Sequence, residues 1–525
     1  MTSDTSQRSS TIREVEKDER DPYLIDSFED GDPSNPKNWS RGRRWYLTAF
    51  SGLLVLNATF ASAAPSGIAV QLMKEYNLSE EVGTLAISLF VAGYCVGPLL
   101  WGPLSEQYGR RPTLLYPFII YTIFQVAAAV AKTGASLLVF RFLGGVFAAA
   151  PLTNTGAVIS DLWDAGTRGK AMALFTLGPF AGPTIGPTIA GFIATSGTNF
   201  RWVFWVLAIF AGVCTILIVL ILPETYAPVL LAKSAQKKRE ETGDSRFYAP
   251  MEKIKLSIWE RVENVLARPF KVLFQEPMLI AITLYMSFVS VSRLLFRIGG
   301  TYPVIYSQAY PHRVYGGAPS QCWVFGPHVF AHHVWAVTAG HAFSSWYLTP
   351  RYEHEVARLA PEAVPPEYRL EMASQLSNRE LLQLNCSINR HYLGPYLCSC
   401  LFWFGWTSYP SITLWAPLLS GFFSGFGISW IFLPLFNYII DTYLFVAASA
   451  LAANTVVRSV FGAVFPLFAT QMYTALGPRW ASSLLGFVAL IMIPIPFVLK
   501  SFGPTIRAKS KYAPTMPRST PVVKG

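Results

Sequence analysis

The chain has 525 residues, of which 52% are hydrophobic and only 14% are charged. Soluble domains carry about 25% charged residues, and a soluble chain of this length would divide into several cores. The formal net charge of +11 does not indicate a nucleic-acid-binding surface, because the basic residues cluster at the ends of long apolar runs. We therefore expect an integral membrane protein that binds no nucleic acid.

Residues 1–44 are polar and include an acidic stretch, which predicts a disordered cytoplasmic tail without a cleavable signal peptide. Residues 45–222 then contain apolar runs of about 20 residues, the length of a helix that crosses a bilayer. Arginine pairs lie in alternate connections, so both termini are expected in the cytoplasm. The predicted spans are Trp45–Ile68, Gly83–Leu104, Thr113–Ala131, Leu137–Ser160, Gly169–Ala194 and Trp202–Leu222.

Residues 223–277 are polar and predict a cytoplasmic linker with an amphipathic interfacial helix. Residues 278–499 form a second helical bundle that is one clear span short of the first, and residues 500–525 form a cytoplasmic tail. Arg201 and Arg479 each precede a tryptophan at the start of the last span of their half, which favours a parallel repeat. The spans expected here are Met278–Phe288, Pro395–Tyr409, Leu414–Ile440, Tyr443–Tyr473 and Trp480–Leu499.

A short charged loop, GPLSEQYGRRP at residues 102–112, separates the second and third spans. Its glycines permit a tight turn and a close helix approach. Its acid can pair with an arginine or accept hydrogen bonds from a helix N-terminus. The residues of this candidate gating loop are Gly102, Glu106, Gly109, Arg110 and Arg111.

Ionisable residues inside the apolar runs are functional candidates by default. Arg141 lies near the middle of the fourth span, where a charge is costly unless it is paired or hydrated. Asp161 and Asp441 end the fourth and tenth spans. Either acid can titrate during transport or pair with a nearby arginine, and pairing is the favoured interpretation.

Glycines in the fifth span recur at four-residue steps, a pattern that allows close helix packing. The prolines beside them remove backbone donors and bend the helix. We expect this span to pack against span eight or eleven; an ordinary small-residue packing face is the alternative. The set is Gly178, Pro179, Gly182, Pro183, Gly186, Pro187 and Gly191.

These motifs resemble the major facilitator superfamily, and more narrowly the fungal twelve-span drug:proton antiporters that include polyamine and multidrug exporters. The loop at 102–112 resembles the signature loop, with Glu106 where aspartate is usual. LLVFRFLGGVFAAAP at 137–151 resembles the fourth-span motif, and LGPFAGPTIGPTIAGF at 177–192 the antiporter motif. NPKNW at 35–39 and NYIIDTY at 437–443 resemble fungal-specific segments.

The resemblance implies an all-α integral membrane fold with two six-helix bundles, about 12 spans in all, and a substrate cavity between them at mid-membrane. It implies a gating latch in the signature loop and a part for Arg141 in proton coupling, although Arg141 can instead join spans one and four. Polar residues of the spans are candidates for the substrate cavity. They are Asn57, Gln125, Asn154, Tyr409, Asn437 and Asn454.

The expected function is proton-coupled export of small organic cations or amphiphiles, such as polyamines, drugs or toxins. The proton gradient would supply the energy, so no cofactor or metal is expected, and we find no pattern typical of an enzyme. The expected partners are a small-molecule substrate, protons and the lipid bilayer. We expect a monomer in the plasma membrane, or in the vacuolar membrane. The alternatives are a nutrient importer or facilitator, a non-transporting receptor, and an inactive copy.

The stretch from about residue 290 to 394 is atypical for this family. It contains all seven histidines, and Arg293 and Arg297 lie where the resemblance implies a glutamate. One interpretation is a metal site at His328, His332 and His333, and another is a histidine-lined pore. A third, which we favour, is an altered reading frame or a retained intron, which would degrade span eight.

Overall fold

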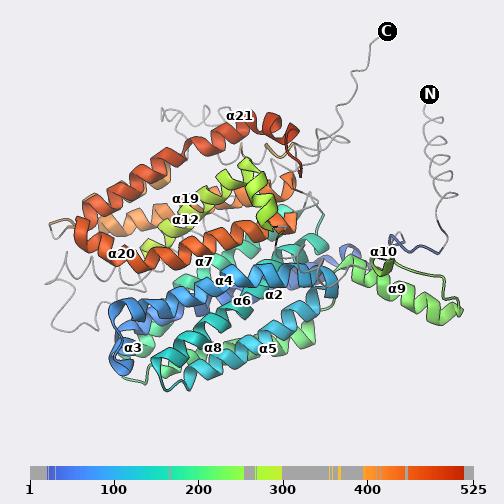
Figure 1. Ribbon diagram of the computed structural model, residues 1–525, viewed down its shortest axis with the longest axis horizontal. Coiled ribbons are helices and arrows are strands. Elements are labelled where there is room, and N and C mark those ends of the chain that lie inside the picture. Colours follow the sequence, from blue (N-terminus) through green and yellow to red (C-terminus); the bar gives the residue numbers. More distant parts are fainter. Residues whose placement is uncertain are drawn as a thin grey trace, which may run out of the picture.

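The computed structural model describes residues 21–253, 267–297 and 394–512, with short gaps at 22, 30, 165–166, 268, 410, 414 and 444–446, and a few positions between 354 and 370. The helices of the described residues form two groups that lie side by side (Figure 1). The first group contains α2 (Arg41–Ala63), α4 (Glu80–Tyr108), α5 (Arg110–Ala129), α6 (Gly134–Leu162), α7 (Arg168–Thr195) and α8 (Arg201–Ile221). The second contains α12 (Pro277–Arg297), α18 (Gly394–Thr407), α19 (Trp415–Thr442), α20 (Ala447–Met492) and α21 (Pro494–Ala508).

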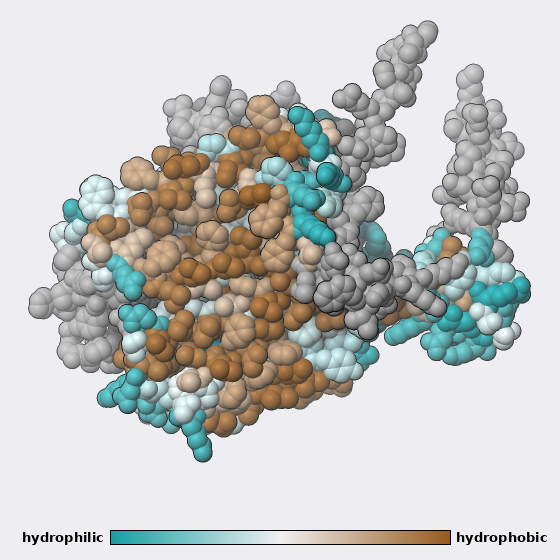
Figure 2. Space-filling view, viewed as in Figure 1, coloured by the Kyte–Doolittle hydropathy of each residue, from teal (hydrophilic) through white to brown (hydrophobic). Residues whose placement is uncertain are grey.

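The outer surface of both groups is apolar, as expected for helices that face lipid. Eight of the described helices are long and apolar enough to cross a membrane, or nine if the bent pair Pro269–Gln275 and Pro277–Val291 is one span. Figure 2 shows an apolar band across both groups, with polar residues at its two ends. The side chains of Leu220 and Ile491, in two of the apolar helices, are largely uncovered by other residues of the protein, with 74% and 76% of their surface exposed. The predicted all-α membrane fold is confirmed.

The linker helices project from one end of the bundle, which we call the linker end. Here α9 (Ala227–Thr242) follows α8, and the short α10 (Pro250–Lys253) lies beside α9 (Figure 1). The predicted interfacial helix begins at residue 254, and residues 254–266 lie outside the described part of the chain.

The N-terminal segment differs from the expected disordered tail over residues 21–40. Leu24 forms a parallel bridge with Tyr248, and Ile25 and Phe28 pack against buried residues of α9. A 3-10 helix at Pro36–Asn38 is capped by Asn35, which precedes it. The first part of the tail, residues 1–20, lies outside the described residues. This segment therefore packs on the linker before α2 begins.

Arg201 and Arg479 occupy equivalent places in the two groups, as the parallel repeat predicts. The guanidinium of Arg201, the first residue of α8, donates to the carbonyl oxygens of Ala129 and Ala131 at the end of α5, at 3.1 and 2.6 Å. The guanidinium of Arg479 lies 3.7 Å from the centroid of the Tyr409 ring, just after α18. Gly477, with φ +70°, breaks α20 into two spans just before Arg479.

The atypical stretch at about 290–394 falls outside the described residues, except for the end of α12 and isolated positions from 354 to 370. The candidate metal ligands His328, His332 and His333 and the degraded span eight lie in that undescribed part. The three interpretations of this stretch therefore stay predictions.

Candidate gating loop and transport cavity

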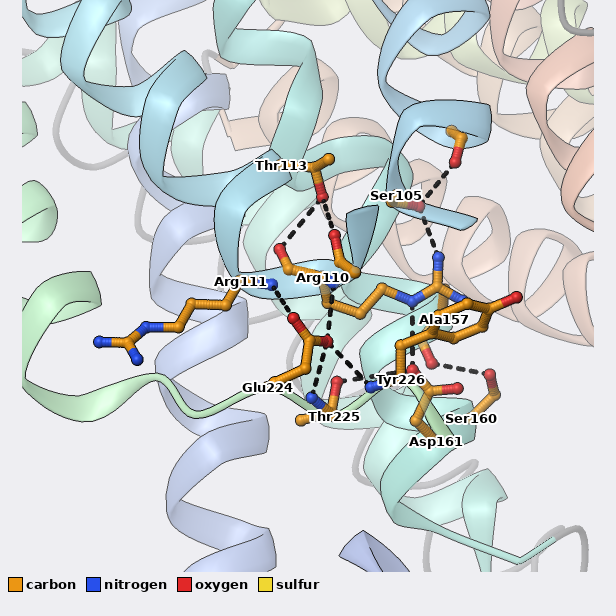
Figure 3. Close-up of polar contacts among 12 residues, drawn as sticks. Ser105, Arg110, Arg111, Thr113, Ala157, Ser160, Asp161, Glu224, Thr225 and Tyr226 are labelled. Carbon is orange, nitrogen blue, oxygen red and sulfur yellow. Dashed lines mark hydrogen bonds and ion pairs between the residues drawn. The ribbon is translucent and has the colours of Figure 1, made fainter. Parts of the chain in front are cut away.

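The gating loop is held by Glu224, which follows the last residues of α8. The backbone N–H groups of Arg110 and Arg111 donate to its two carboxylate oxygens, at 2.8 and 3.2 Å (Figure 3). These are the first N–H groups of α5, whose N-cap residue, Gly109, has no side chain to accept them. Glu224 thus serves as the missing cap and places a negative charge at the helix N-terminus.

Gly109 is required at this turn for two reasons. Its backbone has φ +95° and ψ 171°, a region that only glycine adopts readily. A Cβ atom at this position would also overlap the carboxylate of Glu224. Gly102 differs, because a Cβ there would meet only Thr153, at an ordinary contact distance of 3.4 Å. The two glycines of the loop therefore have different roles.

Arg110 forms a buried ion pair with Asp161 at the end of α6. Its Nε lies 3.1 Å from Asp161 Oδ2, and the two side chains expose only 8% and 16% of their surface. The same guanidinium donates to the hydroxyl of Ser105 and lies 4.5 Å from the centroid of the Tyr226 ring. Burial raises the pKa of the Tyr226 phenol above its usual value, and the carboxylates of Glu106 and Asp161 add to this effect. Asp161 thus has the arginine partner that the sequence favoured.

Arg141 is 1% exposed and joins three helices of the first group. Its Nε donates to the carbonyl of Ala86 in α4 at 2.9 Å, and its Nη2 to that of Ser62 in α2 at 3.3 Å. Its guanidinium lies 4.1 Å from the centroid of the Phe90 ring. No described carboxylate forms an ion pair with it, and Nη1 has no hydrogen-bond partner. These contacts favour the interhelical role, and proton coupling by Arg141 stays a prediction.

The glycine face of α7 packs against α2 and not against span eleven, while span eight lies outside the described residues. A Cβ on Gly178 would lie 2.8 Å from the carbonyl of Gly52, and one on Gly186 would lie 2.8 Å from that of Phe60. The hydroxyl of Thr59 donates to the carbonyl of Gly178 at 3.0 Å. Close packing of the backbones leaves no space for side chains on this face.

The proline face of α7 lines a cavity between the two groups of helices. The cavity has a volume of about 350 Å³, within the usual range for small-molecule sites. Pro179 and Pro183 line it, and the Phe180 ring beside them contacts the Phe432 ring of α19 in an edge-to-face geometry, with centroids 5.6 Å apart. The glycine periodicity thus identified a packing face, and the structure shows that α2 is its partner.

Helices from both groups line the cavity. The first group contributes hydroxyl and amide groups, among them Thr59, Ser62 and Asn154. The second contributes aromatic and aliphatic groups from α19 and α20, including Phe432 and Phe436, together with polar groups of α20 such as Thr455 and Arg458. Glu106 and Arg110 of the gating loop also line the cavity, so the loop and the cavity form one continuous site.

Of the polar residues predicted for the substrate cavity, only Asn154 lines it. Asn57 points between α2 and α8, where its amide lies 3.8 Å from Cys214 Sγ. Asn437 donates to the Leu433 carbonyl of its own helix at 3.0 Å, and Asn454 is fully buried in α20. The remaining cavity candidates are also elsewhere: Gln125 is buried in α5, and Tyr409 stacks on Arg479. Asp441, a candidate for proton coupling, is partly exposed at the end of α19 and does not line the cavity.

Two charged residues of the site, Glu224 and Arg458, and one residue outside it, Glu367, were not predicted. Glu224 could have been found as an acid that directly follows the apolar run of span six. Arg458 is a lone charge within the apolar helix Ser449–Ala469 and lines the cavity. Glu367 lies in the atypical stretch and forms a bidentate pair with Arg507 of α21, at 2.8 and 2.7 Å.

The chain matches the Major Facilitator Superfamily over residues 50–354, more than half of its length. The multidrug transporter mdrA of Aspergillus fumigatus is 38% identical over 498 residues, which cover 94% of this chain and 76% of the relative. The citrinin biosynthesis cluster transporter mrr1 of Monascus ruber is 37% identical over 94% of this chain and 93% of its own. The xylose transporter XylE from E. coli has a TM-score of 0.54 at 15% identity, over 88% of this chain and 98% of its own.

The fold and the cavity between two helix groups define a multi-pass membrane transporter, not an enzyme. The chain belongs to the major facilitator superfamily. The predicted family is thereby confirmed, and its fold with two helical bundles is shared with XylE.

Proposed function

We propose that this transporter exports amphiphilic organic compounds, such as drugs or toxins, in exchange for protons. The observation that carries the proposal is the cavity between the helix groups, which combines apolar and aromatic walls with a few hydroxyl, amide and charged groups. Such a surface accepts amphiphiles with little demand on their shape. The names of the relatives support export, since they include a multidrug transporter and a transporter of a citrinin biosynthesis cluster.

Alternating access would operate by a rocking of one helix group against the other around this cavity. Between the groups, α4 packs along the first part of α20. A Cβ on Gly462 of α20 would meet Val91 of α4 at an ordinary 3.4 Å, so this contact is less tight than that between α7 and α2. We infer that α4 and α20 slide or separate, whereas α2 and α7 stay together.

We propose that Glu106 or Asp161 carries the proton. Glu106 lines the cavity, and Asp161 is paired with Arg110, which also lines it. Protonation of Asp161 would remove the ion pair and leave Arg110 free to change its position. A carboxyl whose pKa depends on access to each side of the membrane is what proton exchange requires.

The proposed setting is the plasma membrane, with the linker end and both termini in the cytoplasm and the protein acting as a monomer. The distribution of charge supports this orientation. Arg43, Arg110, Arg168 and Lys237 all lie at or near the linker end, as the excess of positive charge in cytoplasmic loops predicts.

The test is transport in everted plasma-membrane vesicles from yeast cells that lack their own exporters and express the full chain. An imposed pH gradient, acidic inside, should drive uptake of an exported fluorescent amphiphile, and a protonophore should abolish it. Asp161→Asn should uncouple uptake from the gradient. Asp164→Asn is the matched control, because Asp164 is 65% exposed and pairs with Lys37 outside the cavity. Uptake that ignores the gradient in wild-type vesicles would rule out proton exchange.

A further inference from the structure

Arg458 is the charged residue that α20 contributes to the cavity wall. Its guanidinium lies 5.1 Å from the centroid of the Phe432 ring of α19, which also lines the cavity. No described carboxylate forms an ion pair with Arg458, and no described residue accepts a hydrogen bond from it. A charge inside a membrane is rarely left without a partner unless it serves a ligand or lies in a wet cavity.

Among the described residues, no ion pair joins Arg458 to the other charges of the cavity. Arg110 is paired with Asp161, and Glu106 belongs to the gating loop, near the end of α4. On the wall formed by α6, Asn154 is 1% exposed, and its Nδ2 has no hydrogen-bond partner. Arg458 and Asn154 thus offer unused donors, and an arginine fork suits a carboxylate because it can donate two parallel hydrogen bonds.

We propose that Arg458 forms a subsite for the anionic group, most simply a carboxylate, of an amphiphilic substrate whose apolar part contacts Phe432 and Phe436. The proposal rests on the export function and specifies its substrate class. It differs from the expectation of organic cations, because a cation beside Arg458 would meet a like charge in a largely apolar cavity.

A purely structural role for Arg458 makes a different prediction. If its contact with Phe432 only joined α19 to α20, its loss would lower thermal stability and would impair all substrates equally. A subsite affects anionic substrates alone. The two roles are therefore separated by a pair of substrates that share a skeleton and differ in charge.

The experiment compares fluorescein, an anion at neutral pH, with rhodamine 123, a cation on the same ring system, in the everted vesicles described above. The variants are Arg458→Gln, Arg458→Lys and, as a matched control outside the cavity, Arg479→Gln. The half-saturating concentration for uptake and the melting temperature in detergent are measured for each. We expect Arg458→Gln to raise the half-saturating concentration of fluorescein by about tenfold or more, the effect of losing a hydrogen bond between charged groups. Arg458→Lys should retain most of the affinity, and Arg479→Gln should leave it unchanged.

Three results would overturn the inference. The first is wild-type uptake of rhodamine 123 without uptake of fluorescein, which leaves export standing and removes the anion subsite. The second is an equal loss for both dyes in Arg458→Gln, which indicates a structural role. The third is fluorescein uptake by Arg458→Gln with wild-type affinity. Wild-type vesicles that take up neither dye nor any other amphiphile would count against the export function itself.

Discussion

Gly109→Ala is the substitution whose effect can be derived most directly from the structure. The backbone region at Gly109 costs other residues about 1–3 kcal/mol. The new Cβ would also overlap the carboxylate of Glu224, which must then move away from the N–H groups of Arg110 and Arg111. A hydrogen bond to a charged group contributes roughly 1.5–3 kcal/mol, and Glu224 is partly exposed, so we count the loss of one. The expected cost is about 2.5–6 kcal/mol.

The assay is thermal unfolding of the purified protein in detergent, followed by intrinsic fluorescence. Gly102→Ala is the matched control from the same loop, because its Cβ would meet only Thr153 at 3.4 Å. We expect Gly109→Ala to melt several degrees below wild type and Gly102→Ala to match wild type. The double variant Gly109→Ala with Glu224→Gln should lose less than the sum of the single variants, since both disturb the same contact. Equal melting of Gly109→Ala and Gly102→Ala would refute the reasoning.

Three further predictions concern other parts of the protein. Gly182→Ala should reduce the yield of folded protein, because its Cβ would overlap the hydroxyl of Thr59. The control Gly212→Ala, whose Cβ meets only Thr122 at 3.9 Å, should keep or raise the melting temperature. The yield from size-exclusion chromatography and the melting temperature test both expectations. Arg141→Lys should lower transport by about tenfold at an unchanged membrane level, because lysine cannot donate to Ala86 and Ser62 in the same geometry; full transport by the lysine variant would contradict this. At the linker, a hydrogen bond from Arg239 lowers the pKa of Glu252, so the folded state binds fewer protons than the unfolded state. The contact between α9 and α10 should therefore be fully present above the usual glutamate pKa and should be lost as the pH falls through the lowered pKa. Amide exchange in α9 should show this pH dependence in wild type but not in Glu252→Gln.

The apolar periodicity of the sequence was sufficient to predict the fold, because a helix that crosses lipid must be long, apolar and internally hydrogen-bonded. The residues of the gating loop were identifiable for a similar reason, since glycines and charges between two spans are conspicuous. The partner of that loop was not identifiable. Glu224 is distant in sequence, and only the folded structure brings it to the N-terminus of α5.

Orientation of residues within a span was harder to predict. Asn57 and Asn154 are both polar residues in apolar helices and both are 1% exposed, yet only Asn154 lines the cavity. Burial between helices and burial at a cavity have the same sequence pattern. Arg458, in contrast, could have been predicted from the sequence, because it is a lone charge within an apolar span, as Arg141 is. A lone arginine in an apolar span is the same sequence signal at both positions.

Ion pairs at the linker end limit what a gating latch can do. In the first group, the contacts of Arg110 with Glu224, Asp161 and Ser105 all lie within that group. In the second group, Arg507 of α21 is paired with Glu367. The order of acid and base differs between the two groups. In the first group the acid, Glu224, follows the last span, whereas in the second group the base, Arg507, lies in the last span.

Glu224 ties the segment after α8 to α5, and Glu367 is tied to α21 through Arg507. The other hydrogen-bond partners of Arg110 lie in α4 and α6, so none of these contacts crosses to the second group. Rocking of the bundles therefore does not require Arg110 to release Glu224. The contacts that must change are those between the groups, along α4 and α20 and around the cavity. Glu106 is the residue of the gating loop whose carboxylate lines that cavity. A latch that opens during transport is thus better assigned to Glu106, while the contact of the backbone N–H groups of Arg110 and Arg111 with Glu224 keeps the start of α5 fixed to the end of α8 as the bundle moves.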